Sequence, residues 1–346
     1  MSFSRILLIQ LKHLGDVLLI TPVIAALRAA FPQAAISALT PLGMEAMLTE
    51  HPQLTAVLTV DRRQRSPRRL WELARGLRRP GFDLVLEFSG GDRGAFYTWL
   101  TGAGTRVGFA HPRRPFWHRR LAFTLLAPAP PLREHTVIKN LALVRALGIE
   151  PGQPRLEFFW NDRTEEQVQG ILGQFGLTHK NFVVVHPPAR WLFKCWTAPG
   201  YARVIDALQK DYRLPVVLTA GPAPQEMALI QEILELVQTA PVNLAGKVDL
   251  KALGALIAQA RLFLGVDSAP MHLAAAVDTP SVVLFGPSGP YNWRPWGQRH
   301  IVLTKDLDCQ PCGRDGCDGA KLSRCLTQIT PAEVLAAVDR QLTPCT

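Results

Sequence analysis

The 346-residue sequence lacks any run of about 18 uninterrupted apolar residues, the length that a membrane-spanning helix needs. We also expect no signal peptide. The short apolar run at residues 5–11 is soon broken by polar residues, and no small-residue cleavage site follows it. These absences predict a buried first strand and a cytoplasmic chain. No tandem repeat or low-complexity segment occurs, and 48% hydrophobic with 19% charged residues is a globular composition.

Acidic residues are in short supply: 28 Asp and Glu face 38 Lys and Arg, giving a net charge of +10. This balance indicates an anionic partner, such as nucleic acid, an anionic membrane face or a phosphorylated substrate. The alternative is that the positive charge serves only to keep the protein soluble. Arginines are concentrated at 61–79, and in 111–120 beside Phe116 and Trp117.

Cysteines are few, and four of the six fall within one 17-residue window. The window holds Cys309, Cys312, Cys317 and Cys325, whereas Cys195 and Cys345 stand apart. In a cytosolic chain such residues are reduced thiols or metal ligands rather than disulfides. The spacing C-x2-C-x4-C-x7-C fits a structural zinc site, but the two close pairs of a zinc ribbon are missing. Four reduced thiols in a loop are the alternative. A catalytic thiol is not favoured, because no His lies beside these cysteines in the sequence.

Apolar strands alternate with amphipathic helices along the chain, which predicts parallel sheets with helices on both faces. Residues 15–31 read as one helix after the first strand, for example. The Pro, Gly and charged residues of 150–162 interrupt this alternation before it restarts. We therefore predict two Rossmann-like α/β domains, 1–155 and 156–346. Ligands of such sheets bind outside the carboxyl ends of the strands, so the strand-to-helix junctions decide function.

The junction at 12–22 contains Gly15, which permits a tight turn or a close approach to a ligand, and Asp16 at a helix start. Asp16 is either an N-cap or a general base facing a cleft. No G-x-G-x-x-G is present, so a nicotinamide dinucleotide fingerprint is missing.

Two junctions in the second half carry charged groups. Arg190 and Lys194 follow the strand at 182–187 and suit a phosphate or pyrophosphate, although a solvated basic loop is the alternative. Glu226 stands in the first turn of a helix after the strand at 215–221. There its negative charge interacts favourably with the helix dipole, or its carboxylate accepts a hydrogen bond from a ribose hydroxyl.

The last informative junction follows the strand at 262–267. Asp267 and Ser268 can cap the next helix, and the small Ala269 lets an anion approach the helix start. His272 lies one turn further on, either as an ordinary core or surface residue or as a ligand contact. Together the junctions describe a base in the first half and a diphosphate-linked donor in the second, facing one cleft.

Residues 13–32, 184–196, 244–290 and 307–319 together resemble the lipopolysaccharide heptosyltransferases of glycosyltransferase family 9. The resemblance covers nearly the whole chain and is weakest over 40–150. Residues 190–196 and the cysteine window look most like the members that add a branching heptose to the second core heptose. The resemblance implies a GT-B fold, with two Rossmann-like domains whose parallel sheets face a central cleft.

The resemblance also implies inverting transfer of L-glycero-D-manno-heptose from ADP-heptose to the inner core, with no cofactor and no catalytic metal. The sequence has no paired-acid motif typical of metal-dependent transferases. Asp16 matches the catalytic acid of the family and Lys194 its phosphate-binding lysine, while Arg190 adds charge. Asp267, Ser268 and His272 match its donor-binding residues. Glu226, or Gln225 if the alignment slips by one, matches its ribose contact, and Val248 lies where the family lines the adenine site.

One departure from the family pattern is Ala269, where related enzymes often have Gly, and its methyl group crowds the diphosphate. For the phosphorylated, membrane-held acceptor we expect Lys12, Gly15, Arg62 and Arg63 to form the binding site. The basic clusters would also hold the enzyme peripherally on the anionic cytoplasmic face of the inner membrane.

Three alternatives stay open from the sequence. A family member with another nucleotide sugar or core acceptor has the same motifs. A nucleotide-sugar epimerase has a similar two-domain α/β architecture, but it needs no large acceptor, so the Arg-rich first half would have no function. A nucleic-acid-binding protein fits the charge, but no groove-reading module is recognisable, so we expect no nucleic-acid partner.

Overall fold

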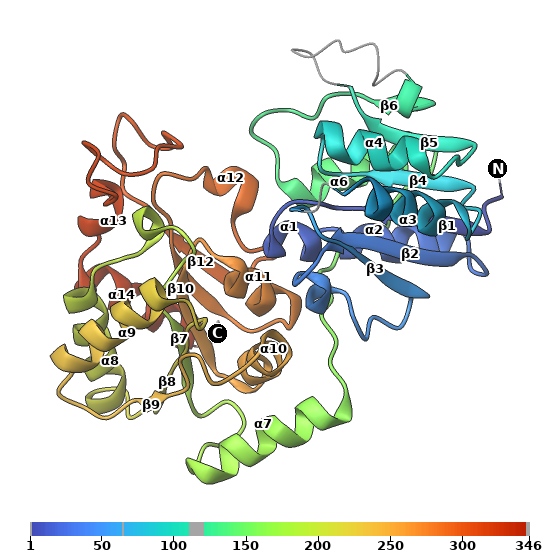
Figure 1. Cartoon of the computed structure of the whole chain (residues 1–346). Helices are drawn as coiled ribbons and strands as arrows, with labels where there is room; N and C mark the ends of the chain where they lie inside the picture. The colour runs from blue at the N-terminus through green and yellow to red at the C-terminus, as the bar shows by residue number, and fades with distance from the viewer. Residues whose placement is uncertain (1, 64–65, 111–120, 344–346) are drawn as a thin grey trace. The chain divides into compact units, whose positions relative to one another are not determined.

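The computed structural model describes residues 2–63, 66–110 and 121–343, so the basic cluster predicted at 111–120 lies outside the described residues. The chain divides into two compact units, Met1–Phe159 (unit 1) and Trp160–Thr346 (unit 2). The division falls close to the predicted domain boundary, within the Pro- and Gly-containing segment that breaks the alternation. Each unit contains one six-stranded parallel sheet (Figure 1).

Unit 1 is built on strands in the order β3-β2-β1-β4-β5-β6. The strands are β1 (Arg5–Ile9), β2 (Ala35–Pro41), β3 (Ala56–Val60), β4 (Leu84–Glu87), β5 (Thr105–Phe109) and β6 (Leu125–Ala127). The helices are α1 (Leu14–Leu18), α2 (Thr21–Ala30), η1 (Glu45–Met47), α3 (Pro67–Arg78), α4 (Asp92–Leu100) and α6 (Thr136–Arg145). Strand order reverses between β1 and β4, which is the switch point where doubly wound sheets bind ligands.

Unit 2 has the order β12-β11-β10-β7-β8-β9, with its switch point between β7 and β10. Its strands are β7 (Val183–His186), β8 (Val216–Leu218), β9 (Val242–Asn243), β10 (Leu262–Val266), β11 (Ser281–Leu284) and β12 (His300–Leu303). Its helices are α7 (Asp162–Gln174), η2 (Leu192–Lys194), α8 (Ala198–Lys210), α9 (Pro224–Leu236), α10 (Leu250–Gln259), α11 (Ala269–Ala276), α12 (Pro290–Trp293), α13 (Arg324–Thr327) and α14 (Pro331–Leu342).

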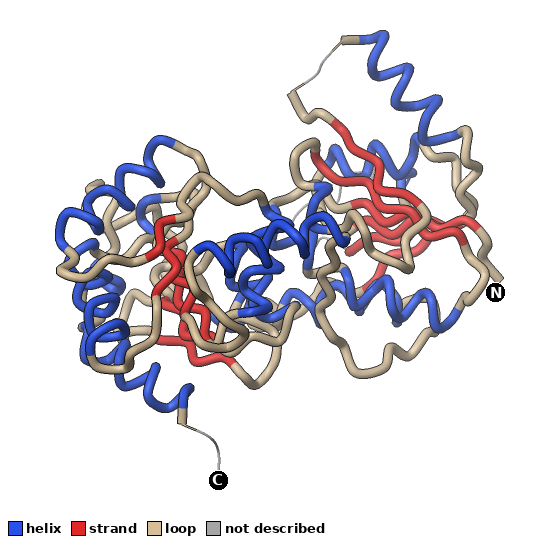
Figure 2. The backbone as a smooth tube through the Cα atoms, turned by 90° about the horizontal axis from the view of Figure 1, so that it is seen from below, coloured by secondary structure: helices blue, strands red, loops and turns tan. Residues whose placement is uncertain are grey.

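Continuous apolar strands explain both sheets. The central strands β1 and β10 are buried almost throughout, as expected for parallel strands covered on both faces. Helices flank the strand layer of each unit on both sides in Figure 2. In unit 1, for example, Leu77 of α3 and Leu100 of α4 pack into one buried cluster with Leu7 of β1 and Val85 of β4.

The predicted helix over 15–31 is wrong in one respect, because the structure has two helices, α1 and α2, separated at residues 19–20. Asn140 of α6 donates from Nδ2 to the Leu19 carbonyl (2.9 Å), and Thr21 Oγ1 donates to the Leu18 carbonyl (3.0 Å). These side chains satisfy buried backbone oxygens that a continuous helix would have paired. The break lets α1 stand as a short helix directly after β1.

Among the described residues, none of the helices combines the length and the apolar character needed to cross a membrane.

Candidate functional site

Asp16 follows β1 and the loop at residues 10–13, at the switch point of unit 1. It is the third residue of α1, so the N-cap interpretation is wrong in position: the N-cap is His13, and Asp16 Oδ2 accepts a hydrogen bond from the His13 backbone N–H (3.2 Å). The residue is only 6% exposed. Burial raises the pKa of this carboxyl above its usual 3.8, while the nearby charge of Lys12 and the His13 N–H oppose the rise. A carboxylate with a raised pKa is suited to accept a proton.

The predicted acceptor residues lie around this carboxylate to different degrees. Arg62, just beyond β3, donates from Nη1 to the Leu11 carbonyl (2.9 Å), so it reaches the loop that precedes Asp16. Lys12 is exposed on that same loop. Gly15 is the second residue of α1, where the helical backbone does not require glycine, so the tight-turn expectation fails. Arg63 is exposed and donates only its backbone N–H, to Asp61 Oδ1 (2.8 Å), among the contacts of the described chain.

Sequence reasoning missed a polar network beside Asp16, at the ends of β1 and β4. Glu87 is fully buried, and its two carboxylate oxygens accept the backbone N–H groups of Ser89 (2.8 Å) and Gly90 (3.0 Å). Ser89 Oγ in turn accepts the Leu11 N–H (2.7 Å) and bonds to Gln10 Oε1 (3.3 Å). The network ties the end of β4 to the loop that precedes Asp16. The acid inside the otherwise apolar run 84–88 was the signal that could have found it.

In unit 2, Lys194 and Asp267 come together at the switch point. Lys194 belongs to the loop after β7 and Asp267 directly follows β10, yet Nζ and Oδ2 are 2.6 Å apart and both side chains are largely buried. The Trp191 ring lies 5.1 Å from Lys194 Nζ and 5.8 Å from the Arg190 guanidinium carbon, so it stacks against both cations. The structure thereby collects the predicted phosphate-binding cations in one place.

Glu226 lies in the first turn of α9, the helix that follows β8. Its Oε2 accepts the Gly221 N–H (2.8 Å), which is a role that neither earlier interpretation included. Gln225, the alternative residue, has a different partner: its Nε2 donates to the Arg190 carbonyl (3.0 Å). Val248, half-buried, follows β9. Gly246 N–H donates to the Ala220 carbonyl (3.0 Å), which holds the loops after β8 and β9 together.

The prediction that Asp267 and Ser268 cap α11 through their side chains is wrong. Ser268 occupies the N-cap position, but its Oγ donates to the Val266 carbonyl (3.4 Å) and makes no cap hydrogen bond. Asp267 pairs with Lys194 instead. Ala269 is the first helical residue, and Pro270 after it has no N–H, which removes one donor from the helix start. His272 is buried one turn into the helix.

His186, the last residue of β7, is a further buried titratable group. Its Nδ1 lies 3.0 Å from Thr219 Oγ1, and burial lowers its pKa to about 3. The imidazole is therefore neutral at physiological pH and acts as a hydrogen-bonding core residue rather than as a cation for a phosphate.

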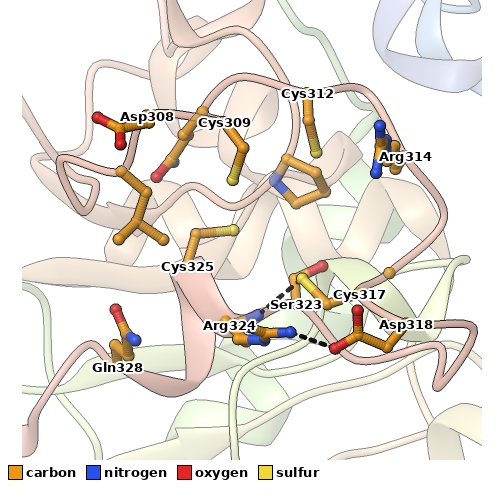
Figure 3. A pocket seen from close by; sticks show the side chains of 14 residues that line it. Asp308, Cys309, Cys312, Arg314, Cys317, Asp318, Ser323, Arg324, Cys325 and Gln328 are labelled. Carbon is orange, nitrogen blue, oxygen red and sulfur yellow. Dashed lines mark hydrogen bonds and ion pairs between the residues drawn. The ribbon is translucent and has the colours of Figure 1, made fainter.

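The four clustered cysteines line one pocket of about 370 Å³ in unit 2, formed mainly by the chain that follows β12 and by α13 (Figure 3). Burial, followed by the nearby thiols of Cys317, Cys312 and Cys309, raises the pKa of Cys325 to about 11. Within the described ranges, no three His, Cys, Asp or Glu side chains already form a group arranged to hold a metal ion.

Comparisons with known proteins agree on one family. Residues 70–322 match the model of glycosyltransferase family 9 (heptosyltransferase). The chain is 34% identical over 337 residues to lipopolysaccharide heptosyltransferase 3 of Escherichia coli, covering 95% of this chain and 96% of that protein. A family 9 glycosyltransferase structure from Veillonella parvula superimposes with a TM-score of 0.85 at 25% identity, covering 99% and 98%. E. coli heptosyltransferase WaaC with ADP gives 0.77 at 20% identity, covering 98% and 100%, and shares the GT-B fold.

Proposed function

Because the chain belongs to glycosyltransferase family 9, the heptosyltransferases, we propose that it transfers L-glycero-D-manno-heptose from ADP-heptose to a heptose of the lipopolysaccharide inner core. One observation carries the proposal. The predicted base and the predicted phosphate-binding lysine each lie at the switch point of their own sheet, Asp16 beside β1 and Lys194 beside β7. Switch points are where doubly wound sheets bind ligands.

Unit 2 is the proposed donor-binding unit. Lys194 and Arg190 would neutralise the diphosphate of ADP-heptose, and Asp267 would hold the Lys194 ammonium in place. One carboxylate oxygen of Glu226 accepts a hydrogen bond from the Gly221 N–H, and the other would accept one from a ribose hydroxyl. Val248 would line the adenine site. Two cations at the diphosphate support a reaction that needs no catalytic metal.

Unit 1 is the proposed acceptor-binding unit, with Lys12 and Arg62 near its base. The acceptor hydroxyl would attack the anomeric carbon on the face opposite the diphosphate, and Asp16 would take the hydroxyl proton. A new glycosidic bond forms as the bond to ADP breaks, which inverts the anomeric centre. Negative charge that grows on the leaving ADP would be stabilised by Lys194 and Arg190.

The test is ADP release from ADP-heptose, with a lipid A–core acceptor carrying two heptoses and EDTA present. We expect acceptor-dependent release from the wild type, and a fall in kcat of about 10²- to 10⁴-fold in Asp16→Asn, with the KM for ADP-heptose nearly unchanged. Lys194→Ala should instead raise the KM for ADP-heptose. Arg145→Gln serves as the control, because Arg145 is an exposed arginine at the end of α6 in the same unit and belongs to none of the predicted sites. Wild-type activity in Asp16→Asn would refute the base assignment.

We further propose that unit 1 associates with an anionic membrane through an aromatic–arginine surface on α3 and α4, which pack against each other. On α3, Trp71 is 62% exposed and Arg75 stacks over it at 5.5 Å, with Arg79 beside them. On α4, Phe96 and Trp99 are exposed and stack on one another with ring centroids 6.3 Å apart. Exposed indole rings rimmed by arginines suit an anionic lipid interface.

The change Arg75→Gln with Arg79→Gln should weaken binding to vesicles containing phosphatidylglycerol by roughly thirtyfold, since each arginine near the surface contributes about 1 kcal/mol. Arg78 is left intact because its Nε donates to the Leu100 carbonyl (3.0 Å). Cosedimentation at low salt measures the change. Arg163→Gln with Arg203→Gln, which removes two exposed arginines from α7 and α8 of unit 2, is the matched control. Equal binding by the Arg75 and Arg79 double variant and the wild type would contradict this surface.

A further inference from the structure

Residues 304–323 form a long segment without regular secondary structure, between β12 and α13. Loops of this length inside a compact domain are uncommon and are usually functional. Side-chain and backbone contacts hold the segment to the rest of unit 2. Gln310 Nε2 donates to the Phe285 and Gly286 carbonyls (3.3 and 2.8 Å), and Gly313 N–H donates to the Pro287 carbonyl (2.9 Å). Lys305 near its start pairs with Glu333 of α14. The reaction assigned above uses none of its residues.

All four clustered cysteines lie in or next to this segment and line one pocket. Cys309 and Cys312 are exposed, Cys317 is half-buried and Cys325 on α13 is buried. Figure 3 shows the sulfur atoms of Cys309, Cys312 and Cys325 directed toward the same space, with Cys317 at its lower side. Cys312 and Cys325 are 13 positions apart in sequence, and both supply a thiol to the same pocket.

The backbone around the sulfurs has the features of a thiolate ligand loop. Gly313 directly follows Cys312 and has a left-handed φ of +64°, which lets the chain fold back around a C-x2-C pair. The Arg324 backbone N–H lies 3.5 Å from Cys317 Sγ and donates to it. Arg314 and Arg324 line the pocket together with Asp308 and Asp318, and Arg324 forms an ion pair with Asp318. Arg314 would offset part of the −2 charge of a divalent ion bound by four thiolates.

We propose that Cys309, Cys312, Cys317 and Cys325 bind one zinc or iron ion through four thiolates. A set of four sulfur ligands selects these metals and a tetrahedral geometry. Binding of a divalent ion would release four thiol protons. The thiols line the pocket rather than meeting at one point, so binding draws them together through adjustment of the irregular segment, to which the two exposed cysteines belong.

The site would brace the donor-binding loop. Ser323 Oγ, two residues before Cys325, donates to the Phe193 carbonyl (2.6 Å), and Phe193 adjoins Lys194. Trp196 Nε1 donates to the Ile329 carbonyl (3.0 Å), just beyond α13. A metal that fixes α13 against the segment would therefore fix the loop carrying Lys194, so the role is structural and acts at a distance from the reacting atoms.

The experiment measures metal content of the full chain, purified under reducing conditions and incubated with Zn²⁺ or Fe²⁺ before excess metal is removed. We expect about one ion per chain, and after Co²⁺ substitution the absorption of a tetrahedral thiolate complex. Cys309→Ser with Cys312→Ser should lose the ion, whereas Cys195→Ser, a cysteine of the same unit outside the cluster, should keep it. If the double variant does not fold, the exposed single variant Cys309→Ser gives the same comparison.

Three outcomes would overturn the site: no stoichiometric metal in the wild type, equal metal content in the cysteine variants, or a disulfide within the cluster in the reduced preparation. The readout is independent of heptose transfer. An inactive chain that binds metal would leave this inference standing and refute the proposed function, and an active chain without metal would do the reverse.

Discussion

At the scale of single residues, the position of Asp16 decides how it behaves. Placed at the third position of α1 rather than at the N-cap, its carboxylate is buried and reaches back to the His13 N–H. Because burial favours the protonated form, the carboxyl contributes to stability below its raised pKa, and this contribution is lost as the pH rises through that pKa. Asp16→Asn therefore should not unfold the protein at neutral pH, which makes it a clean test of chemistry.

The same burial gives a prediction about pH. A base must be deprotonated, so kcat/KM should fall as the pH is lowered through the raised pKa of Asp16, above the usual 3.8 of an aspartic acid. The Lys12 charge opposes this rise, so Lys12→Gln should move the acidic limb to higher pH. A pH profile of kcat/KM for both proteins measures the shift. An unmoved limb, or one moved to lower pH, would show that another group titrates.

At the scale of elements, the apolar strands were predictable because parallel central strands are continuous apolar runs. The edge strands β6 and β12 were missed, since each is only three or four residues long and partly exposed. The break between α1 and α2 was also missed. It depends on Asn140, more than a hundred residues away in sequence, which satisfies the Leu19 carbonyl. Local periodicity contains no information about such a partner.

Site residues show the same division. Glycine and acidic residues at strand ends indicated which loops matter, because a doubly wound sheet collects those ends on one edge. The Lys194–Asp267 pair could not be predicted from either residue alone, because it forms across two loops that meet only when β7 and β10 pair in the sheet. Likewise, the role of Glu87 depends on the Ser89 and Gly90 amides and on the absence of a side chain at Gly94, whose Cβ would overlap the carboxylate.

At the scale of the whole molecule, the two units repeat one architecture without a repeat in sequence. Counted from the first strand of each unit, both sheets have the order 3-2-1-4-5-6, read from opposite ends. Equivalent switch points nevertheless carry different chemistry: a buried carboxylate in unit 1, and a lysine paired with an aspartate in unit 2. The same fold therefore offers an anion-repelling group in one unit and an anion-binding group in the other, which suits opposite sides of a transfer reaction.

This difference predicts where a nucleotide binds. ADP alone should protect backbone amides from hydrogen exchange in unit 2, in the loops that follow β7, β8, β9 and β10, because these hold Lys194, Glu226, Val248 and Asp267. The Asp16 loop and Arg62 in unit 1 should change little. Hydrogen-exchange mass spectrometry measures this, and Lys194→Ala should lose the protection while its core strands exchange as in the wild type. Protection centred on residues 11–16 would instead place the nucleotide in unit 1, where the buried carboxylate disfavours a diphosphate, and would reverse the roles assigned to the two units.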